Sequence, residues 1–306
     1  MCKGRKRSSL APVRLSSVRP LNVARLEQII TKERPDVLLP NLGGQSGLNL
    51  CSELAQAGVL EKYNVEVIGV QVDAIERGED RIAFKNTMDA LGIEVARSEV
   101  AYSVGQALEI ADRLGYPVVL RPSYVLGGRG MEVVYDPQNL KKYMAAAVGV
   151  TPDRPILIDR FLNHALECEA DAISDGNHAF VPAVMEHIEL AGVHSGDSAC
   201  IIPSRHISDE NVATIKEYTR KIAEQMGVKG LMNMQYAIEN DKVFVLEANP
   251  RASRTVPLVS KVCNIPMVSL AIKIVTAELT GHESPVANLK ERNIPYYGVK
   301  EAVLNP

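Results

Sequence analysis

Two apolar segments joined by a short polar link constrain the fold of this chain most. Residues 231–238 and 243–249 are rich in apolar side chains, and residues 239–242 between them read Glu-Asn-Asp-Lys. Asparagine and aspartate are common turn residues, so the pattern predicts a β-hairpin with its turn near Asp241. In that register Gln235 lies opposite Glu247, and directly opposed side chains interact.

The end of the second segment carries three polar side chains at alternate positions. Residues two apart in a strand face the same side, so Glu247, Asn249 and Arg251 would share one face if the strand continues. Magnesium takes oxygen ligands, and arginine carries a permanent positive charge that suits phosphate. Together with Gln235, these residues predict a site for a magnesium-bound phosphate chain. The alternative is a strand end followed by a polar loop.

Composition narrows the class of protein. The chain has 306 residues, 46% of them hydrophobic, which is enough for one large or two smaller domains. A net charge of -3 and an aromatic content of 5% argue against a nucleic-acid partner. No apolar run approaches the roughly 18 to 20 residues that span a bilayer, so no membrane partner is predicted. The scattered cysteines have no CxxC spacing, which predicts neither disulfides nor a zinc site and indicates a cytoplasmic location.

Residues 1–19 differ from the rest of the chain. They are rich in lysine and arginine, and no acidic residue precedes Glu27. Such a segment is typical of a transit peptide, of a disordered tail or of the remainder of a longer upstream region. We predict a basic disordered tail without a targeting role.

Residues 20–76 predict a small α/β unit. Its glycine loop at 41–47 fits neither G-x-G-x-x-G nor the Walker A pattern, so the Gly43-Gly44 pair is interpreted as a structural turn. A Rossmann-type sheet needs more strands than this unit offers, so we predict a truncated Rossmann-like domain. The elements are a helix capped by Asn22, a strand at 36–40, a helix at 48–57 and a strand at 65–70.

A glycine-rich loop at 122–130 separates two further predicted strands, 117–121 and 131–135. Such a loop can close over phosphates through its backbone N–H groups, and Arg121 would add a positive charge at the strand end. The alternative is a mobile hairpin loop.

The remaining pattern predicts a mixture of helices and strands with no internal repeat. The elements are a helix with a capping box at Ser103 and Gln106 that Gly115 ends, strands at 156–159, 168–173 and 179–184, a donor-rich loop at 190–198 around His194, a helix capped by Ser208 that runs to Gln225, and a helix at 268–279.

Five motifs follow one another along the chain. They are residues 79–81 (Glu-Asp-Arg), 121–128 (Arg-Pro-Ser-Tyr-Val-Leu-Gly-Gly), 185–189 (Met-Glu-His-Ile-Glu), 192–198 (Gly-Val-His-Ser-Gly-Asp-Ser) and 247–254 (Glu-Ala-Asn-Pro-Arg-Ala-Ser-Arg). In this order they resemble the ATP-grasp fold, and the chain is similar to the carbamoyl phosphate synthase large subunit. The resemblance covers roughly residue 20 to the C-terminus and implies an α/β protein, α+β in part, with an ATP-grasp fold after a truncated Rossmann-like pre-ATP-grasp domain. The implied boundaries are 1–19, 20–76, 77–285 and a C-terminal extension at 286–306.

The family's large subunit contains two homologous synthetase halves, and this chain has the length of one. Residues 122–129, 193–200 and 295–301 resemble the second half, which phosphorylates carbamate, whereas 60–64 is more similar to the first, which phosphorylates bicarbonate. The family's first domain opens with further strands and a helix that have no counterpart in this N-terminus.

The resemblance implies a role for each matching residue. Gln235 and Glu247 would ligate magnesium and line the ATP site, and Asn249 would be a further metal ligand. Arg251 and Arg254 would be catalytic residues that hold carboxyphosphate or carbamate. The other residues that would bind ATP are Arg81, Arg121, Gly127, Gly128, Arg160, Leu162, Glu167, Gly192, Val193, His194 and Ser195.

The implied function is that of a ligase domain that uses ATP and Mg²⁺ (or Mn²⁺). It would phosphorylate carbamate or bicarbonate toward carbamoyl phosphate, for arginine and pyrimidine biosynthesis. The implied partners are ATP, bicarbonate or carbamate, ammonia, a glutaminase subunit and a complementary synthetase half. Two alternatives remain: another ATP-grasp ligase that joins a carboxylate to an amine, and an incomplete nucleotide-binding fragment that needs a partner chain.

Overall fold

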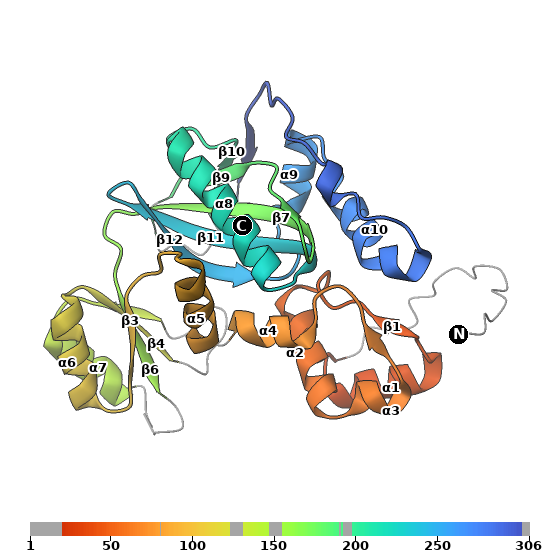
Figure 1. Cartoon of the computed structure of the whole chain (residues 1–306). Helices are drawn as coiled ribbons and strands as arrows, with labels where there is room; N and C mark the ends of the chain where they lie inside the picture. The colour runs from red at the N-terminus through yellow and green to blue at the C-terminus, as the bar shows by residue number, and fades with distance from the viewer. Residues whose placement is uncertain are drawn as a thin grey trace, which may run out of the picture.

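The computed structural model describes residues 20–79, 81–122, 131–146, 155–189, 191 and 198–301. Figure 1 shows three parts, which we call the N-terminal unit (20–79), the small-sheet unit (the described residues between 98 and 160) and the main-sheet unit (the described residues between 161 and 301). Helix α5 (Arg81–Leu91) and residues 92–97 connect the first unit to the second.

The N-terminal unit packs helices around a short parallel pair of strands. Asn22 caps the first helix as predicted, since its side chain accepts a hydrogen bond from the Arg25 N–H at 3.0 Å. The strands are shorter than predicted. The elements are α1 (Val23–Glu33), β1 (Val37–Leu38), α2 (Gly44–Gln56), α3 (Val59–Tyr63), β2 (Glu66–Val67) and α4 (Val72–Glu79).

Helix α2 begins at Gly44, four residues before the predicted start. Its first turn contains Gly47, where an added Cβ would lie 2.7 Å from the carbonyl oxygen of Pro40. The missing side chain therefore lets the helix begin directly after the strand end. Sequence rules treat clustered glycines as a loop, which is why this start was predicted too late.

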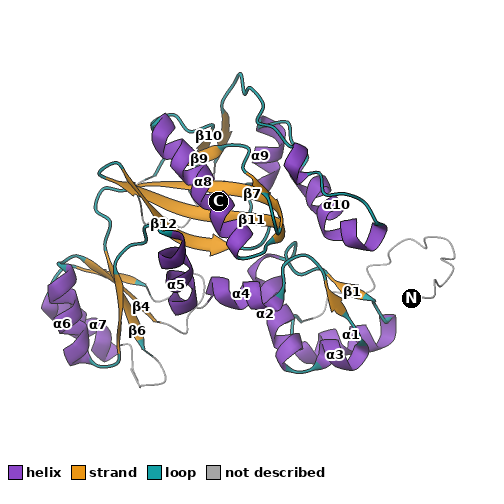
Figure 2. Cartoon of the chain, viewed as in Figure 1, coloured by secondary structure: helices purple, strands orange, loops and turns teal. Residues whose placement is uncertain are grey.

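The small-sheet unit is an antiparallel sheet with two helices packed against it (Figure 2). The strand order is β3-β6-β4-β5, and Ser103 caps α6 with a hydrogen bond from the Gln106 N–H at 3.2 Å, as predicted. The elements are β3 (Ser98–Ala101), α6 (Val104–Leu114), β4 (Val118–Pro122), β5 (Glu132–Val134), α7 (Pro137–Ala146) and β6 (Ile156–Arg160).

The main-sheet unit is built on an antiparallel sheet in the order β12-β11-β7-β9-β10-β13, with β8 paired to β7. The segment predicted as a C-terminal extension contributes β13, which pairs with β10 at one edge. The strands are β7 (Leu166–Asp175), β8 (Ala179–Phe180), β9 (Val184–His187), β10 (Cys200–Ile202), β11 (Lys229–Glu239), β12 (Lys242–Asn249) and β13 (Gly298–Lys300).

Helices cover both faces of the main sheet (Figure 1). Side chains of α8 (Asp209–Gln225) and α5 pack on one face around the buried Tyr236. Helices α9 (Val256–Val262) and α10 (Met267–Thr280) pack on the other around Met185 and Leu231, followed by the short helix η1 (Val286–Asn288). The predicted helices 208–225 and 268–279 are both confirmed.

Membrane spans and cysteine pairing are reported for the described residues alone. No single helix among them is long and apolar enough to cross a membrane. Helix α9 and residues Met267–Ala277 of α10 reach the required length and hydropathy only when taken together, and the chain bends by 108° between them. The four described cysteines are buried and free: Cys51, Cys168, Cys200 and Cys263.

Candidate functional site

The register of the main sheet lines up two rows of polar side chains on one face. In the first row Gln235 of β11 pairs with Glu247 of β12 on one side and with Glu169 of β7 on the other. The predicted opposition of Gln235 and Glu247 is therefore confirmed. The second row lies two residues further along each of the three strands and consists of Asp171, Asn233 and Asn249.

The two rows lie between apolar clusters on the same face. Toward one end, Leu231 and Ile173 belong to the core under α9 and α10. Toward the other end, Ala237 joins a cluster with Leu162 and Phe244. Because neighbouring positions on this face are apolar, the polar rows mark a specific polar site and not a generally solvated surface.

Asn233 and Asp171 form the most deeply buried part of the site. The Nδ2 of Asn233 donates to Glu169 Oε2 at 3.1 Å and to Asp171 Oδ1 at 3.0 Å. Asp171 also accepts hydrogen bonds from the hydroxyls of Ser253 and Thr255. Burial raises the pKa of Asp171 to about 6, although these donors work against the shift.

His187 lies between two carboxylates at the edge of the first row. Its Nε2 is 3.2 Å from Glu169 Oε1 and its Nδ1 is 3.4 Å from Glu167 Oε2, and neither nitrogen has a well-aligned hydrogen bond to the residues that the structure describes. Burial alone would lower the pKa of His187, but its contacts with Cys200 and the two carboxylates outweigh burial and raise it. Burial alone would raise the pKa of Glu169, yet His187 and Asn233 lower it. The result is a buried charged pair.

Arg251 joins the end of β12 to the N-terminal unit. Its Nη2 donates to Asn249 Oδ1 at 3.1 Å and its Nε donates to Gln45 Oε1 at 3.3 Å. Burial lowers the pKa of this guanidinium, and the charge of Glu247 opposes that shift. The strand ends at Asn249, so alternation along a strand does not extend to Arg251 as the prediction required, and it is the hydrogen bond from Nη2 to Asn249 Oδ1 that brings the two side chains together.

The predicted metal ligands offer a carboxylate and two amide groups. Gln235 and Glu247 are half-buried, whereas Asn249 is buried and its Nδ2 has no hydrogen-bond partner among the described residues. The Asn249 oxygen has two lone pairs, so it can accept from Arg251 and still ligate a metal. In the described ranges no three His, Cys, Asp or Glu side chains are placed to hold a metal, so a cation here would need the amide oxygens. Hard oxygen donors fit Mg²⁺.

The predicted residues near the small sheet are engaged in ion pairs. Arg121 on β4 pairs with Asp159 on β6. Arg160, at the end of β6, pairs with Glu239 at the end of β11. The short segment after β6 carries Leu162 into the apolar cluster beside Ala237. The small sheet is thus tied to the polar face through residues 160–162.

The remaining predicted residues cannot be placed in the site. Arg254 is exposed on the loop after β12, and Arg81 is the first residue of α5, with its side chain outside the description. The residues that lie outside the described ranges are Gly127, Gly128, Gly192, Val193, His194 and Ser195.

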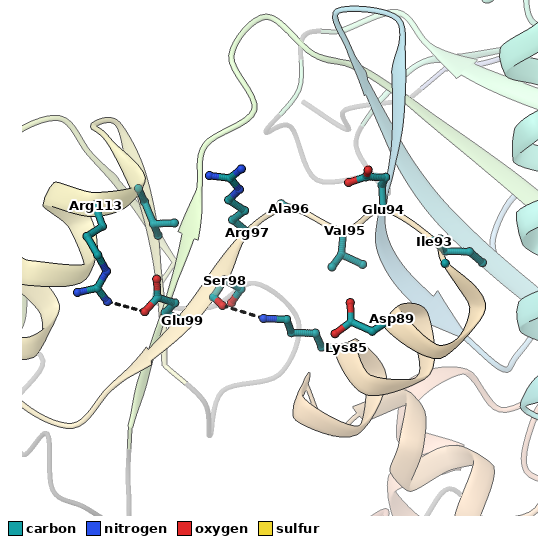
Figure 3. A pocket seen from close by; sticks show the side chains of 12 residues that line it. Lys85, Asp89, Ile93, Glu94, Val95, Ala96, Arg97, Ser98, Glu99 and Arg113 are labelled. Carbon is teal, nitrogen blue, oxygen red and sulfur yellow. Dashed lines mark hydrogen bonds and ion pairs between the residues drawn. The ribbon is translucent and has the colours of Figure 1, made fainter.

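A cavity of about 700 Å³ lies apart from the polar rows, beside the connecting segment 92–97 (Figure 3). In Figure 3, Val95 lies on the side of the segment that faces Lys85 and Asp89, whereas the Glu94 and Arg97 side chains extend from the opposite side. Lys85 donates to the Ser98 carbonyl at 3.4 Å across it. None of the predicted site residues lines this cavity.

Sequence reasoning missed four buried members of the site: Glu169, Asp171, Asn233 and His187. Acidic residues at 167, 169 and 171 were a usable signal, because alternate positions on a strand face one side. The predicted strand at 168–173 was interpreted by its apolar residues, so its opposite face received no role.

Two family models match the chain. Residues 80–281 match the carbamoyl-phosphate synthase L chain, ATP binding domain, and residues 15–77 match the carbamoyl phosphate synthase preATP-grasp domain. The carbamoyl phosphate synthase large chain of Methanothermobacter thermautotrophicus is 45% identical over 287 residues, 93% of this chain and 26% of that one. The C-terminal section of the large chain of Aquifex aeolicus is 46% identical over 255 residues, 83% of this chain and 46% of that one. The chain thus spans about a quarter of the length of full-length relatives.

Solved structures with low sequence identity share the fold. The biotin carboxylase domain of 2-oxoglutarate carboxylase from Hydrogenobacter thermophilus, in complex with MgADP, ADP and bicarbonate, matches 92% of this chain and 62% of its own with a TM-score of 0.72 and 19% identity. Biotin carboxylase from Campylobacter jejuni matches 83% of this chain and 57% of its own, with a TM-score of 0.69 and 20% identity. With these matches, the chain belongs to the carbamoyl-phosphate synthase large-chain family and has the ATP-grasp fold predicted from its motifs.

Proposed function

We propose that this chain binds MgATP on the polar face of the main sheet and transfers the γ-phosphoryl group to carbamate or bicarbonate, toward carbamoyl phosphate. One observation carries the proposal. Gln235 stands directly opposite Glu247, and Asn249 is hydrogen-bonded to Arg251 in the next row. Oxygen ligands and a fixed cation thus meet where a metal-bound phosphate chain needs both.

Magnesium would be held by Glu247, Gln235 and Asn249, and would neutralise phosphate charge when bound. The nearby residues suit the rest of the nucleotide. Leu162, in its cluster with Ala237, offers an apolar surface for a base. Glu167 is half-buried at the start of β7 and would accept a ribose hydroxyl.

The chemical step needs positioning and charge neutralisation more than covalent participation. An acceptor oxygen forms a bond to the γ-phosphorus while the bond to the β,γ-bridging oxygen breaks, so that ADP leaves. Arg251 would hold the carboxylate of the acceptor, with Arg254 beside it on the same loop. Arg121 on the small sheet would contact the phosphates from the other side.

The further partners follow from the family. Ammonia would supply the nitrogen, and a glutaminase subunit would supply the ammonia. A complementary synthetase half would supply the second phosphorylation, which is consistent with the greater length of the relatives. The working location would be the cytoplasm, where the pathway's products, arginine and pyrimidines, are made.

The test is ADP release from MgATP with bicarbonate, carbamate and ammonia varied separately. Stimulation by carbamate alone would assign carbamate phosphorylation, and stimulation by bicarbonate would assign the other half-reaction. Stimulation only by an amino-acid acceptor would instead favour a carboxylate–amine ligase. MgATP must also raise the unfolding temperature, because a ligand of the native state stabilises it. No shift at saturating MgATP would overturn the proposal.

A further inference from the structure

The loop at 250–255, between β12 and α9, is fastened to the main sheet by one buried carboxylate. Asp171 of β7 is only 1% exposed. Its Oδ1 accepts a hydrogen bond from Ser253 Oγ at 2.8 Å, and its Oδ2 accepts one from Thr255 Oγ1 at 2.7 Å. The two hydroxyl oxygens are 2.6 Å apart, and the Thr255 N–H donates to Ser253 Oγ at 3.1 Å. These contacts close a small ring of hydrogen bonds around the carboxylate.

The carboxylate is itself held by the sheet. The Nδ2 of Asn233, directly across the ladder, donates to Asp171 Oδ1 at 3.0 Å and to Glu169 Oε2 at 3.1 Å. A fully satisfied polar network of this kind is rigid, because each member has one arrangement that meets all its partners. The position of the loop is therefore fixed relative to the central strands of the sheet.

The loop carries two cations. Arg251 is on one side of Ser253 and Arg254 on the other. Burial lowers the pKa of Arg251, while the charges of Glu247, Glu169 and Asp171 favour its charged form.

We propose that Asp171 is a positioning residue that fixes the orientation of Arg251 and Arg254 through the hydroxyls of Ser253 and Thr255. The inference rests on the proposed function, in which these arginines hold the acceptor and the transferred phosphoryl group. Asp171 is too deeply buried to touch a substrate, so its effect must pass through the loop. It should therefore change turnover and acceptor affinity, and leave MgATP affinity largely unchanged.

Thr255 offers the sharpest variants. Thr255→Val keeps the shape of the side chain and removes the hydroxyl, whereas Thr255→Ser keeps the hydroxyl and removes a methyl group. Asp171→Asn keeps the shape and removes the charge and one acceptor, because an amide nitrogen in place of Oδ2 cannot accept the hydrogen bond that the Thr255 hydroxyl donates. Asp175→Asn, at the far end of β7 in a turn, is the matched control for an aspartate on the same strand.

The experiment measures three quantities on the full chain: kcat and KM for acceptor-stimulated ADP release, the MgATP-induced shift in unfolding temperature, and amide hydrogen exchange of residues 250–255. We expect kcat to fall about tenfold in Thr255→Val and Asp171→Asn, with recovery in Thr255→Ser. Exchange in the loop should accelerate in the first two variants, and the MgATP shift should persist in all of them.

Two results would overturn the inference, and each can be told from a failure of the proposed function. Unchanged exchange at 250–255 in Asp171→Asn would show that the carboxylate does not order the loop, whatever the enzyme does. Faster exchange with kcat and acceptor KM unchanged would reduce Asp171 to a purely structural role. A wild-type chain that neither binds MgATP nor releases ADP would instead refute the proposed function, while the exchange data would still decide whether Asp171 orders the loop.

Discussion

Arg251 in the main-sheet unit donates a hydrogen bond to Gln45 in the N-terminal unit, with its Nε 3.3 Å from Oε1. Next to it, the Ala252 N–H donates to the Asn41 carbonyl at 2.9 Å. Asn41 in turn donates through Nδ2 to the Lys229 carbonyl at 3.1 Å. The loop that carries Arg251 is thus held from two sides, by the main sheet and by the glycine-containing segment that sequence rules had identified only as a turn.

Replacing Gln45 by alanine should impair the acceptor step and spare nucleotide binding. The Arg251 guanidinium would lose one of its acceptors, and a hydrogen bond to a charged group contributes roughly 1.5 to 3 kcal/mol. We expect kcat/KM for the acceptor to fall about tenfold with an unchanged MgATP thermal shift. Gln28→Ala on the exposed face of α1 is the control. Equal losses in both variants would argue against a specific role for Gln45.

Replacing Glu247 by glutamine should remove turnover while the fold persists. The change keeps the shape of the half-buried side chain and removes the charge that would bind magnesium. We expect ADP release to fall by about 100-fold or more, with a small change in unfolding temperature without ligand. Glu217→Gln on the surface of α8 is the matched control. Turnover equal to wild type would remove Glu247 as the key ligand.

Replacing Glu239 by glutamine should weaken nucleotide binding. Glu239 pairs with Arg160 and accepts the Asn163 N–H at 2.7 Å, so it fixes the segment that carries Leu162. Loss of its charge should raise the KM for ATP by about tenfold and leave acceptor affinity unchanged. Glu283→Gln, an exposed glutamate beyond α10, serves as control. An unchanged ATP KM would show that this ion pair has no part in the nucleotide site.

Stability should fall as the pH rises above neutrality, and His187 should cause part of the fall. Its pKa is raised in the folded state above its ordinary 6.5, so the stabilisation is complete below that value and is lost as the pH rises toward the folded pKa. The largest slope that one such group can give is about 1.4 kcal/mol per pH unit. Urea unfolding at pH 7, 8 and 9 should show a weaker decline in His187→Gln. Parallel curves would mean that the buried imidazole is not charged.

The part of the site that could be predicted from the sequence is the part made by local structure. The hairpin joins its strands through a short turn at Asn240 and Asp241, both of which have positive φ angles. Turn chemistry fixes the pairing from Glu239–Lys242 to Tyr236–Val245, and a β-bulge between Gln235 and Tyr236 then brings Gln235 opposite Glu247, as expected. Helix caps such as Ser103 and Ser208 are similarly local and were correctly placed.

The part that could not be predicted depends on strand pairing between distant segments. Asn233 meets Glu169 and Asp171, which lie 64 and 62 positions away in the chain. A sequence pattern shows that a strand alternates, yet it does not show which strand lies beside it or in which register. The same limit applies to His187, whose charge depends on carboxylates from β7.

The connecting segment before the small sheet is attached to both sheets at once. Val95 bridges to Val245 at the edge of the main sheet, and the Arg97 carbonyl accepts the Arg160 N–H at 2.8 Å. Val245 is two residues before Glu247 on the same strand. The small sheet is therefore anchored to the same strand that carries Glu247, so the position of one sheet relative to the other depends on the strand that supplies the carboxylate of the proposed metal site.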